Sequence, residues 1–141
     1  MRLIDIATKV AWHYLGTPYR WGGDDFSSFD CSGFVIEILK SVGKLPREGD
    51  WTARGLWNLF PTAQYATEGN LVFWSAQHTG DIIHVEYCLN SELSIGASGG
   101  GSKTMTIEDA IRQNAYIKVR PWASRPNVTG FRDPFRKGNE P

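Results

Sequence analysis

Apolar side chains recur at spacings of three and four residues near the start of the chain. Between residues 2 and 15 these positions are Leu3, Ile6, Ala7, Val10, Ala11 and Tyr14. This spacing places them on one face of an α-helix, and Gly16 is a suitable residue to end it. We therefore predict an amphipathic helix over residues 2–15.

A second stripe with helical spacing follows Asp30. Its apolar positions are Phe34, Val35, Ile38, Leu39 and Val42. Asp30 is a favourable N-cap, and Gly43 follows the stripe as a stop. The sequence therefore predicts a helix that begins at Asp30, and a shorter helix is expected over residues 50–60, before Pro61.

Beyond Pro61 the pattern changes to short runs rich in β-branched and aromatic residues, which is typical of strands. The predicted strands cover residues 70–74, 82–90, 93–98 and 115–122. A short helix or turn is expected in "TIEDAIRQN", before the last of them. Because the helices come first and the strands second, we predict an α+β fold with an antiparallel sheet.

Length and charge limit the classes of function. The 141 residues suit one domain, 1–141, in which residues 123–141, rich in Pro, Gly and charge, are expected to form an irregular C-terminal extension. Fifteen basic residues balance fifteen acidic ones, so we expect neither nucleic acid nor a membrane as partner. Asp5, Lys9 and His13 interrupt the first helix, so no signal peptide is expected there. We expect a monomer.

Cys31 lies directly after the N-cap of the second predicted helix. The backbone N–H groups and the dipole at a helix start favour a thiolate, which is one route to a reactive cysteine. A free cysteine is also commonly a small buried apolar side chain, and position alone leaves both interpretations open. Cys31 and Cys88 are the two cysteines, and a domain of this length needs no disulfide framework.

A nucleophilic cysteine needs a base, and His84 is the best placed of the three histidines because it lies near the start of a predicted strand. His13 lies on the first helix and His78 in a polar turn, where solvated histidines are usual. An ordinary strand histidine remains an equal alternative for His84.

Three motifs in this order, "GTPYRWGG", "DCSGFV" and "HVEYCLN", closely resemble the NlpC-type cell-wall peptidases, papain-like cysteine enzymes of bacteria and their phages. The resemblance extends from about Val10 to Gly100. It implies a papain-like fold in which Cys31 is the nucleophile, His84 is the base and Tyr19 frames the oxyanion side. It also implies a peptidoglycan stem peptide as substrate, cut between γ-D-glutamate and the diamino acid, without a metal or organic cofactor.

The chain departs from the family pattern where relatives carry a third polar residue, most often His, about twelve residues after the base. Here that position is Gly96, which has no side chain. Strand alternation places Ser94 and Ser98 about 7 Å to either side on the same face. The hypothesis is that one of these serines, or a water in the space left by Gly96, orients His84.

A second departure is Glu86, where relatives usually have Gly. It shares the strand face of His84, so it could raise the imidazole pKa, crowd the cleft or select a cationic group on the substrate. The alternative is a solvated carboxylate at the sheet margin.

Asp30, Ser32 and Trp21 are further candidates for orienting the site or contacting substrate. Six tryptophans are present; Trp21, Trp51 and Trp57 are candidates for the cleft wall, and core packing is the expected role of Trp12 and Trp74.

Two other functions remain open. An amidase or acyltransferase on the same fold would act on a small amide or lipid. A catalytically weakened wall-binding module is the other, because Gly96 leaves no obvious group to hold His84. The lack of a signal-peptide pattern suits a phage-encoded or tail-associated enzyme, or a domain of a longer secreted protein.

Overall fold

The computed structural model describes residues 1–20, 24–25, 28–100 and 103–136 of the chain. Its helices are α1 (Leu3–His13), α2 (Cys31–Ser41), α3 (Ala53–Leu59) and α4 (Ile107–Gln113). The first three coincide with segments predicted as helical from the sequence, and α4 lies where a short helix or turn was expected. Gly16 and Gly43 follow α1 and α2 with φ of +88° and +74°, a backbone region that favours glycine.

Six strands form one sheet in the order β3-β8-β4-β5-β6-β7, and every neighbouring pair is antiparallel. Their bounds are β3 (Thr62–Ala63), β4 (Leu71–Ser75), β5 (Ile82–Cys88), β6 (Leu93–Ser98), β7 (Tyr116–Pro121) and β8 (Val128–Arg132). A separate two-stranded ribbon joins β1 (Asp24–Asp25) to β2 (Ser28–Phe29). The predicted α+β class with an antiparallel sheet is confirmed.

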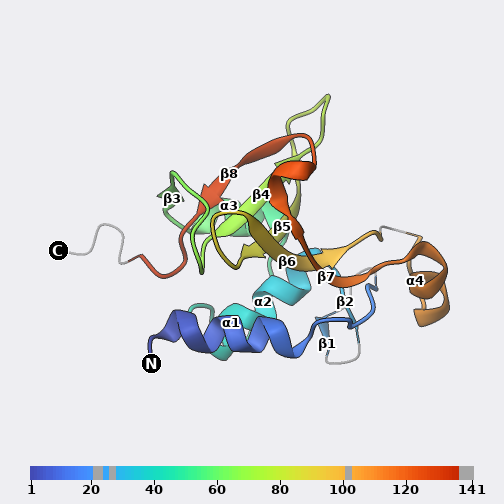
Figure 1. Cartoon of the computed structure of the whole chain (residues 1–141), viewed down its shortest axis with the longest axis horizontal. Helices are drawn as coiled ribbons and strands as arrows, with labels where there is room; N and C mark the ends of the chain where they lie inside the picture. The colour runs from blue at the N-terminus through green and yellow to red at the C-terminus, as the bar shows by residue number, and fades with distance from the viewer. Residues whose placement is uncertain (21–23, 26–27, 101–102, 137–141) are drawn as a thin grey trace.

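The helices α1 and α2 lie together on one side of the large sheet (Figure 1). The apolar stripe of α2 is buried there against alternate residues of β4, β5 and β6. Residues of the main core from these elements include Phe34, Val35, Ile38, Leu39, Phe73, Val85, Tyr87 and Ile95. This packing fixes the start of α2 close to β5 and β6.

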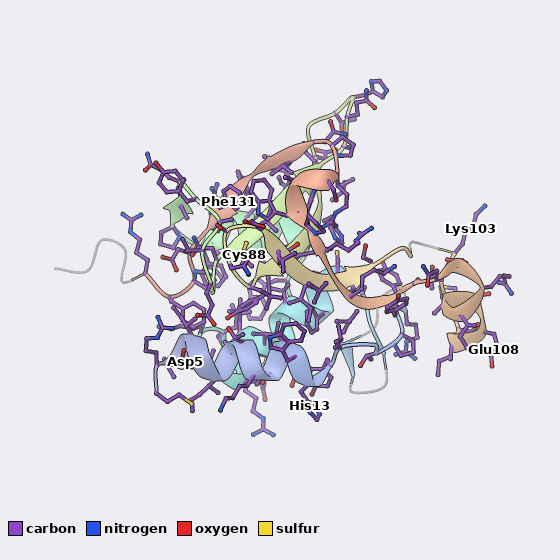
Figure 2. The ribbon with its side chains drawn as sticks, viewed as in Figure 1. Asp5, His13, Cys88, Lys103, Glu108 and Phe131 are labelled. Atoms are coloured by element: carbon purple, nitrogen blue, oxygen red, sulfur yellow. The ribbon has the colours of Figure 1, made fainter. Side chains whose placement is uncertain are left out.

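The segment after Pro121 is not irregular throughout, which corrects the expectation for residues 123–141. A 3-10 turn (Trp122–Ser124) leads to β8, which pairs with both β3 and β4. Val128 and Phe131 pack with Cys88 on the sheet face opposite the helices, where Figure 2 labels Cys88 and Phe131. The Pro, Gly and charge content of this segment did not predict a strand. Strand β8 is stabilised by its pairing with β3 and β4 rather than by its own composition.

The pairing between β5 and β6 stops short of the start of β5. Only Tyr87↔Ile95 and Cys88↔Ser94 are paired, so the residues from Ile82 to Glu86 have no ladder partner on β6 among the described residues. The two strands separate toward His84, and this separation provides room for side chains between them.

Trp12 does not pack in the core: it is 47% exposed, whereas Trp74 is buried as expected. The face of α1 that meets the core carries Ala7 and Ala11, and the residue after Ala11 is turned about 100° around the helix. In Figure 2, α4 projects beyond the sheet, and the labelled Lys103 and Glu108 both lie at this end of the molecule. None of the helices in the described residues is long and apolar enough to cross a membrane.

Candidate active site

Cys31 is the first residue of α2, and the residues on either side of it define the start of the helix. The Asp30 carboxylate accepts a hydrogen bond of 2.6 Å from the Gly33 N–H and one of 3.4 Å from the Ser32 hydroxyl. Asp30 is therefore the N-cap, as predicted, and it holds Ser32 as well. The half-buried Cys31 thiol lies at the positive end of the helix dipole.

The "GTPY" segment reaches the site along the edge strand β7. Gly16 N–H donates to the Ile117 carbonyl at 2.9 Å, and Tyr19 N–H donates to the Ala115 carbonyl at 3.1 Å. The Tyr19 ring packs so closely over Gly100 that a Cβ there would lie 2.4 Å from its Cδ1. Burial raises the pKa of Tyr19, and the nearby negative charges of Cys31 and Asp30 raise it further. Tyr19 is thus held next to Cys31.

A hollow of about 340 Å³ opens where β5 and β6 have separated. Tyr19, Cys31 and His84 all line it, so the structure brings together the three residues predicted from the motifs. The other lining residues are Ile83, Ala97, Ser98, Gly99, Gly100, Arg120 and Arg125. Ser98 therefore reaches the hollow, whereas Ser94, Glu86 and Gly96 are not among its lining residues.

The His84 imidazole interacts with Glu86 and with Cys31. Its Nε2 lies 2.7 Å from Oε2 of Glu86, and Cys31 lies close enough to affect the pKa of the ring. Because Nε2 is engaged by Glu86, Nδ1 is the nitrogen left for the thiol. Burial lowers the pKa of His84, but the hydrogen bond and charge of Cys31, followed by those of Glu86, outweigh burial and raise the pKa to about 9. The ring is therefore cationic near neutral pH.

Glu86 is not a solvated carboxylate; that alternative is wrong, because its side chain is only 1% exposed. Arg125 donates to it from both terminal nitrogens, at 2.7 Å and 2.9 Å, and the Ser94 hydroxyl donates to its Oε1 at 2.8 Å. Burial raises the pKa of Glu86, but His84 and then Arg125 outweigh it and hold the pKa at about 2. A buried carboxylate that stays charged near neutral pH therefore faces the imidazole.

Gly96 is the position that makes room for this carboxylate. A Cβ on Gly96 would lie 2.3 Å from Cγ of Glu86 and 2.7 Å from its Cδ. The Glu86 side chain thus fills the space in which relatives were expected to carry their third polar residue. Ser94 donates to Glu86 and Ser98 accepts a hydrogen bond from Arg120, so the polar contact to Nε2 comes from Glu86 rather than from a serine.

The model of the NlpC/P60 family matches residues 16–121 of the chain. The chain belongs to the NlpC/P60 family. This match covers the "GTPY" segment, the Cys31 helix and the strand of His84, and so includes every part of the hollow described above except Arg125.

Several relatives of the chain are named as peptidases. The chain is 48% identical over 112 residues to the γ-D-glutamyl-L-lysine dipeptidyl-peptidase of Bacillus subtilis (strain 168), covering 76% of this chain and 37% of that protein. It is 28% identical over 130 residues to the probable endopeptidase NlpC of Escherichia coli (strain K12), covering 84% and 82%. It spans only 30% of the probable peptidoglycan endopeptidase LytE of B. subtilis (strain 168) and 17% of protein P54 of Enterococcus faecium.

Solved NlpC/P60 structures share the fold. The NlpC/p60 domain of the peptidoglycan hydrolase SagA matches with a TM-score of 0.69 at 26% identity, over 92% of this chain and 97% of that one. An NlpC/P60 family protein from Bacillus cereus ATCC 10987 matches with a TM-score of 0.75 at 22% identity, over 94% of this chain and 40% of that one. The predicted family is confirmed.

Other candidates lie elsewhere in this NlpC/P60 domain. Trp57 packs edge-on against Phe73 on the sheet, and Trp51 packs by Gly49, so neither lines the hollow, contrary to expectation. Trp21 lies outside the described residues. No cluster of His, Cys, Asp and Glu that could hold a metal occurs in the part of the chain that the structure describes.

Sequence reasoning missed Arg125 altogether. It lies in a segment that was expected to be irregular, far beyond His84 in the chain, and no motif marks it. Strand alternation did place Glu86 on the face of His84. Alternation alone cannot tell whether Glu86 is a buried, ion-paired carboxylate or a solvated one, because that depends on its cationic partner Arg125.

Proposed function

We propose that this chain is a cysteine endopeptidase that hydrolyses the bond between γ-D-glutamate and the diamino acid of a peptidoglycan stem peptide. The observation that carries the proposal is that Cys31, at the start of α2, and His84 line one hollow together. The choice of bond is supported by relatives from two Bacillus species that are named γ-D-glutamyl-L-lysine dipeptidyl-peptidases.

In the first step the Cys31 sulfur attacks the carbonyl carbon of the scissile amide. The sulfur lies at the positive end of the α2 dipole and lines the same hollow as the protonated imidazole of His84. The carbonyl oxygen becomes negative as the C–S bond forms. The backbone N–H of Cys31 and the hydroxyl of Tyr19 are the groups we assign to stabilise that oxygen, since donors fixed in advance act without reorganisation.

The intermediate then collapses to products in two stages. His84 gives its proton to the leaving amine, the C–N bond breaks, and a thioester remains on Cys31. His84, now neutral, takes a proton from water as that water attacks the thioester carbon. The C–S bond breaks, the carboxylic acid product leaves, and the sulfur and the imidazolium return to their starting states.

The test is digestion of purified muropeptides, followed by mass spectrometry of the products. We expect two fragments whose masses sum to that of the substrate plus one water, broken between D-glutamate and the diamino acid. Cys31→Ala should slow this at least about 10³-fold. The matched variant Cys88→Ala should not, because Cys88 is buried in a separate apolar cluster with Trp74 and Val72.

Two results would count against the proposal. Undiminished cleavage by Cys31→Ala would show that Cys31 is not the nucleophile. Intact muropeptides together with turnover of a small amide or an acyl donor would assign the same residues to an amidase or acyltransferase instead.

A further inference from the structure

The imidazole is held by a carboxylate from its own strand. Glu86 follows His84 by two residues on β5, and its Oε2 lies 2.7 Å from Nε2. Side chains two apart on a strand point to the same face, about 7 Å apart at the backbone, so a glutamate is long enough to curl back to the ring. It can do so here because β5 and β6 are unpaired at this end and Gly96 leaves the space empty.

The carboxylate is fixed independently of the ring. Arg125 holds both of its oxygens, and the guanidinium stacks over Trp74 with its Cζ 4.1 Å from the ring centre. Trp74 in turn packs against the His84 ring, with centroids 5.1 Å apart. Two-point pairing of this kind restricts orientation more than a single hydrogen bond does. The arrangement thus restrains the imidazole along its edge and on one side.

From these contacts we infer that Glu86 is the positioning residue of the site and that Glu86 and Gly96 are an exchanged pair. In the family pattern the orienting group belongs to the strand next to the base, here β6, whereas in this chain it is Glu86 on β5, the strand of His84 itself. Gly96 on β6 leaves the space that the Glu86 side chain occupies. Glu86 does not line the hollow, so it acts through His84 and not on substrate. This inference rests on the proposed peptidase function.

Several charged or titratable groups surround this carboxylate, and a pH experiment must include them. His84 and Arg125 contact it directly, and the charge of Glu86 also reaches Cys88, Lys118 and Arg120. Glu86 raises the pKa of His84, so neutralising Glu86 must move the loss of the His84 proton to lower pH.

The experiment compares wild type, Glu86→Gln, Glu86→Gly and a double variant that combines Glu86→Gly with Gly96→His, all on one γ-glutamyl peptide. We expect Glu86→Gln to lower kcat about 10- to 100-fold with KM unchanged, and to shift the alkaline limb of the pH profile to lower pH. We expect the double variant to be faster than Glu86→Gly, because the introduced imidazole restores a polar partner on β6.

Each outcome bears on the inference. A purely structural role for Glu86 would lower the unfolding temperature but leave the alkaline limb in place, and that result would overturn it. A double variant no faster than Glu86→Gly would overturn the exchange with Gly96. An inactive wild type would instead overturn the proposed function, with which this inference also falls.

Two arginines, Arg120 and Arg125, line the hollow, which is an independent observation. Arg125 is ion-paired with Glu86, which also contacts His84. Arg120 donates to the Ser98 hydroxyl, has its Nε buried without a hydrogen-bond partner, and forms no ion pair among the described residues. Such a cation at the edge of a site favours an anionic group on the ligand.

We propose that Arg120 binds the free α-carboxylate of the glutamyl residue at the scissile bond. In a γ-linked residue the side-chain carboxyl forms the amide, so the α-carboxylate stays ionised a few bonds from the scissile carbonyl. The bidentate guanidinium geometry suits a carboxylate, and an uncharged carboxamide in the same place would lose the ionic part of the contact. This second inference also rests on the proposed function.

The test uses two synthetic stem peptides that differ only in carrying an α-carboxylate or an α-carboxamide on D-glutamate. Wild type should cleave the carboxylate peptide about 10- to 100-fold faster in kcat/KM. Arg120→Met should abolish the preference, and the control Arg112→Met, on the exposed side of α4, should keep it. Equal cleavage of both peptides by wild type would overturn the role of Arg120 alone, whereas cleavage of neither would overturn the proposed function.

Discussion

Gly96→Ala tests how closely the sheet is packed around Glu86. The new Cβ would lie 2.3 Å from Cγ, 2.7 Å from Cδ and 3.0 Å from Cβ of Glu86. The glutamate cannot swing away freely, because Arg125 and His84 hold its oxygens. Forcing an extra methyl into a packed interior typically costs about 1 to 3 kcal/mol. For a chain of this size that lowers the thermal unfolding midpoint by about 3 to 15 °C.

The assay is thermal unfolding followed by circular dichroism, with peptide cleavage measured on the same samples. Gly55→Ala, within α3, is the matched control: its Cβ would meet nothing closer than 3.4 Å, and alanine is favoured in a helix by about 1 kcal/mol. In a Glu86→Gly background, Gly96→Ala should cost less, since the clashing side chain is gone. A Gly96→Ala protein with the stability and activity of wild type would refute this close packing.

Thiol labelling, pH dependence and the helix cap offer further tests of the site. A thiol-directed alkylating reagent should label Cys31 much faster than Cys88, because burial raises the pKa of Cys88 to about 12; equal rates would contradict this. Cleavage should decline as the pH rises through about 9, where His84 loses its proton. Glu86 should contribute to the free energy of unfolding above pH 4.5, and this contribution should be lost as the pH falls toward about 2. Urea unfolding at a series of pH values measures this loss. In the same assay Asp30→Ala should lower the free energy of unfolding by about 1 kcal/mol.

The main helices and central strands could be predicted because their apolar spacing reflects burial on one face. The α2 stripe is the clearest example, since its spacing, its cap at Asp30 and its glycine stop agree with one another. β8 could not be predicted, because a segment of mixed composition is a strand only when β3 and β4 are there to pair with it. Trp12 shows the same limit, since a large apolar residue need not face the core.

The candidate site divides in the same way. The resemblance of three local motifs to the NlpC-type peptidases implied Cys31, His84 and Tyr19 as site residues. The sequence also showed that position 96 lacks the polar side chain expected from the family pattern. It could not show that Glu86 takes this place, because the burial of Glu86 depends on its ion pair with Arg125. Two further strands, β6 and β7, separate these residues in the sequence. Long-range ion pairs have no spacing rule in a single sequence.

Trapping a thioester on Cys31 is the decisive measurement for the proposed chemistry. The protein is mixed with a γ-D-glutamyl stem peptide, quenched in acid within milliseconds to seconds, and measured as an intact protein and as mapped fragments by mass spectrometry. We predict an added mass equal to the acyl part of the peptide, located on Cys31 and absent from Cys31→Ser. Product formation with no adduct in any quench, or with the adduct on Cys88, would contradict nucleophilic attack by Cys31.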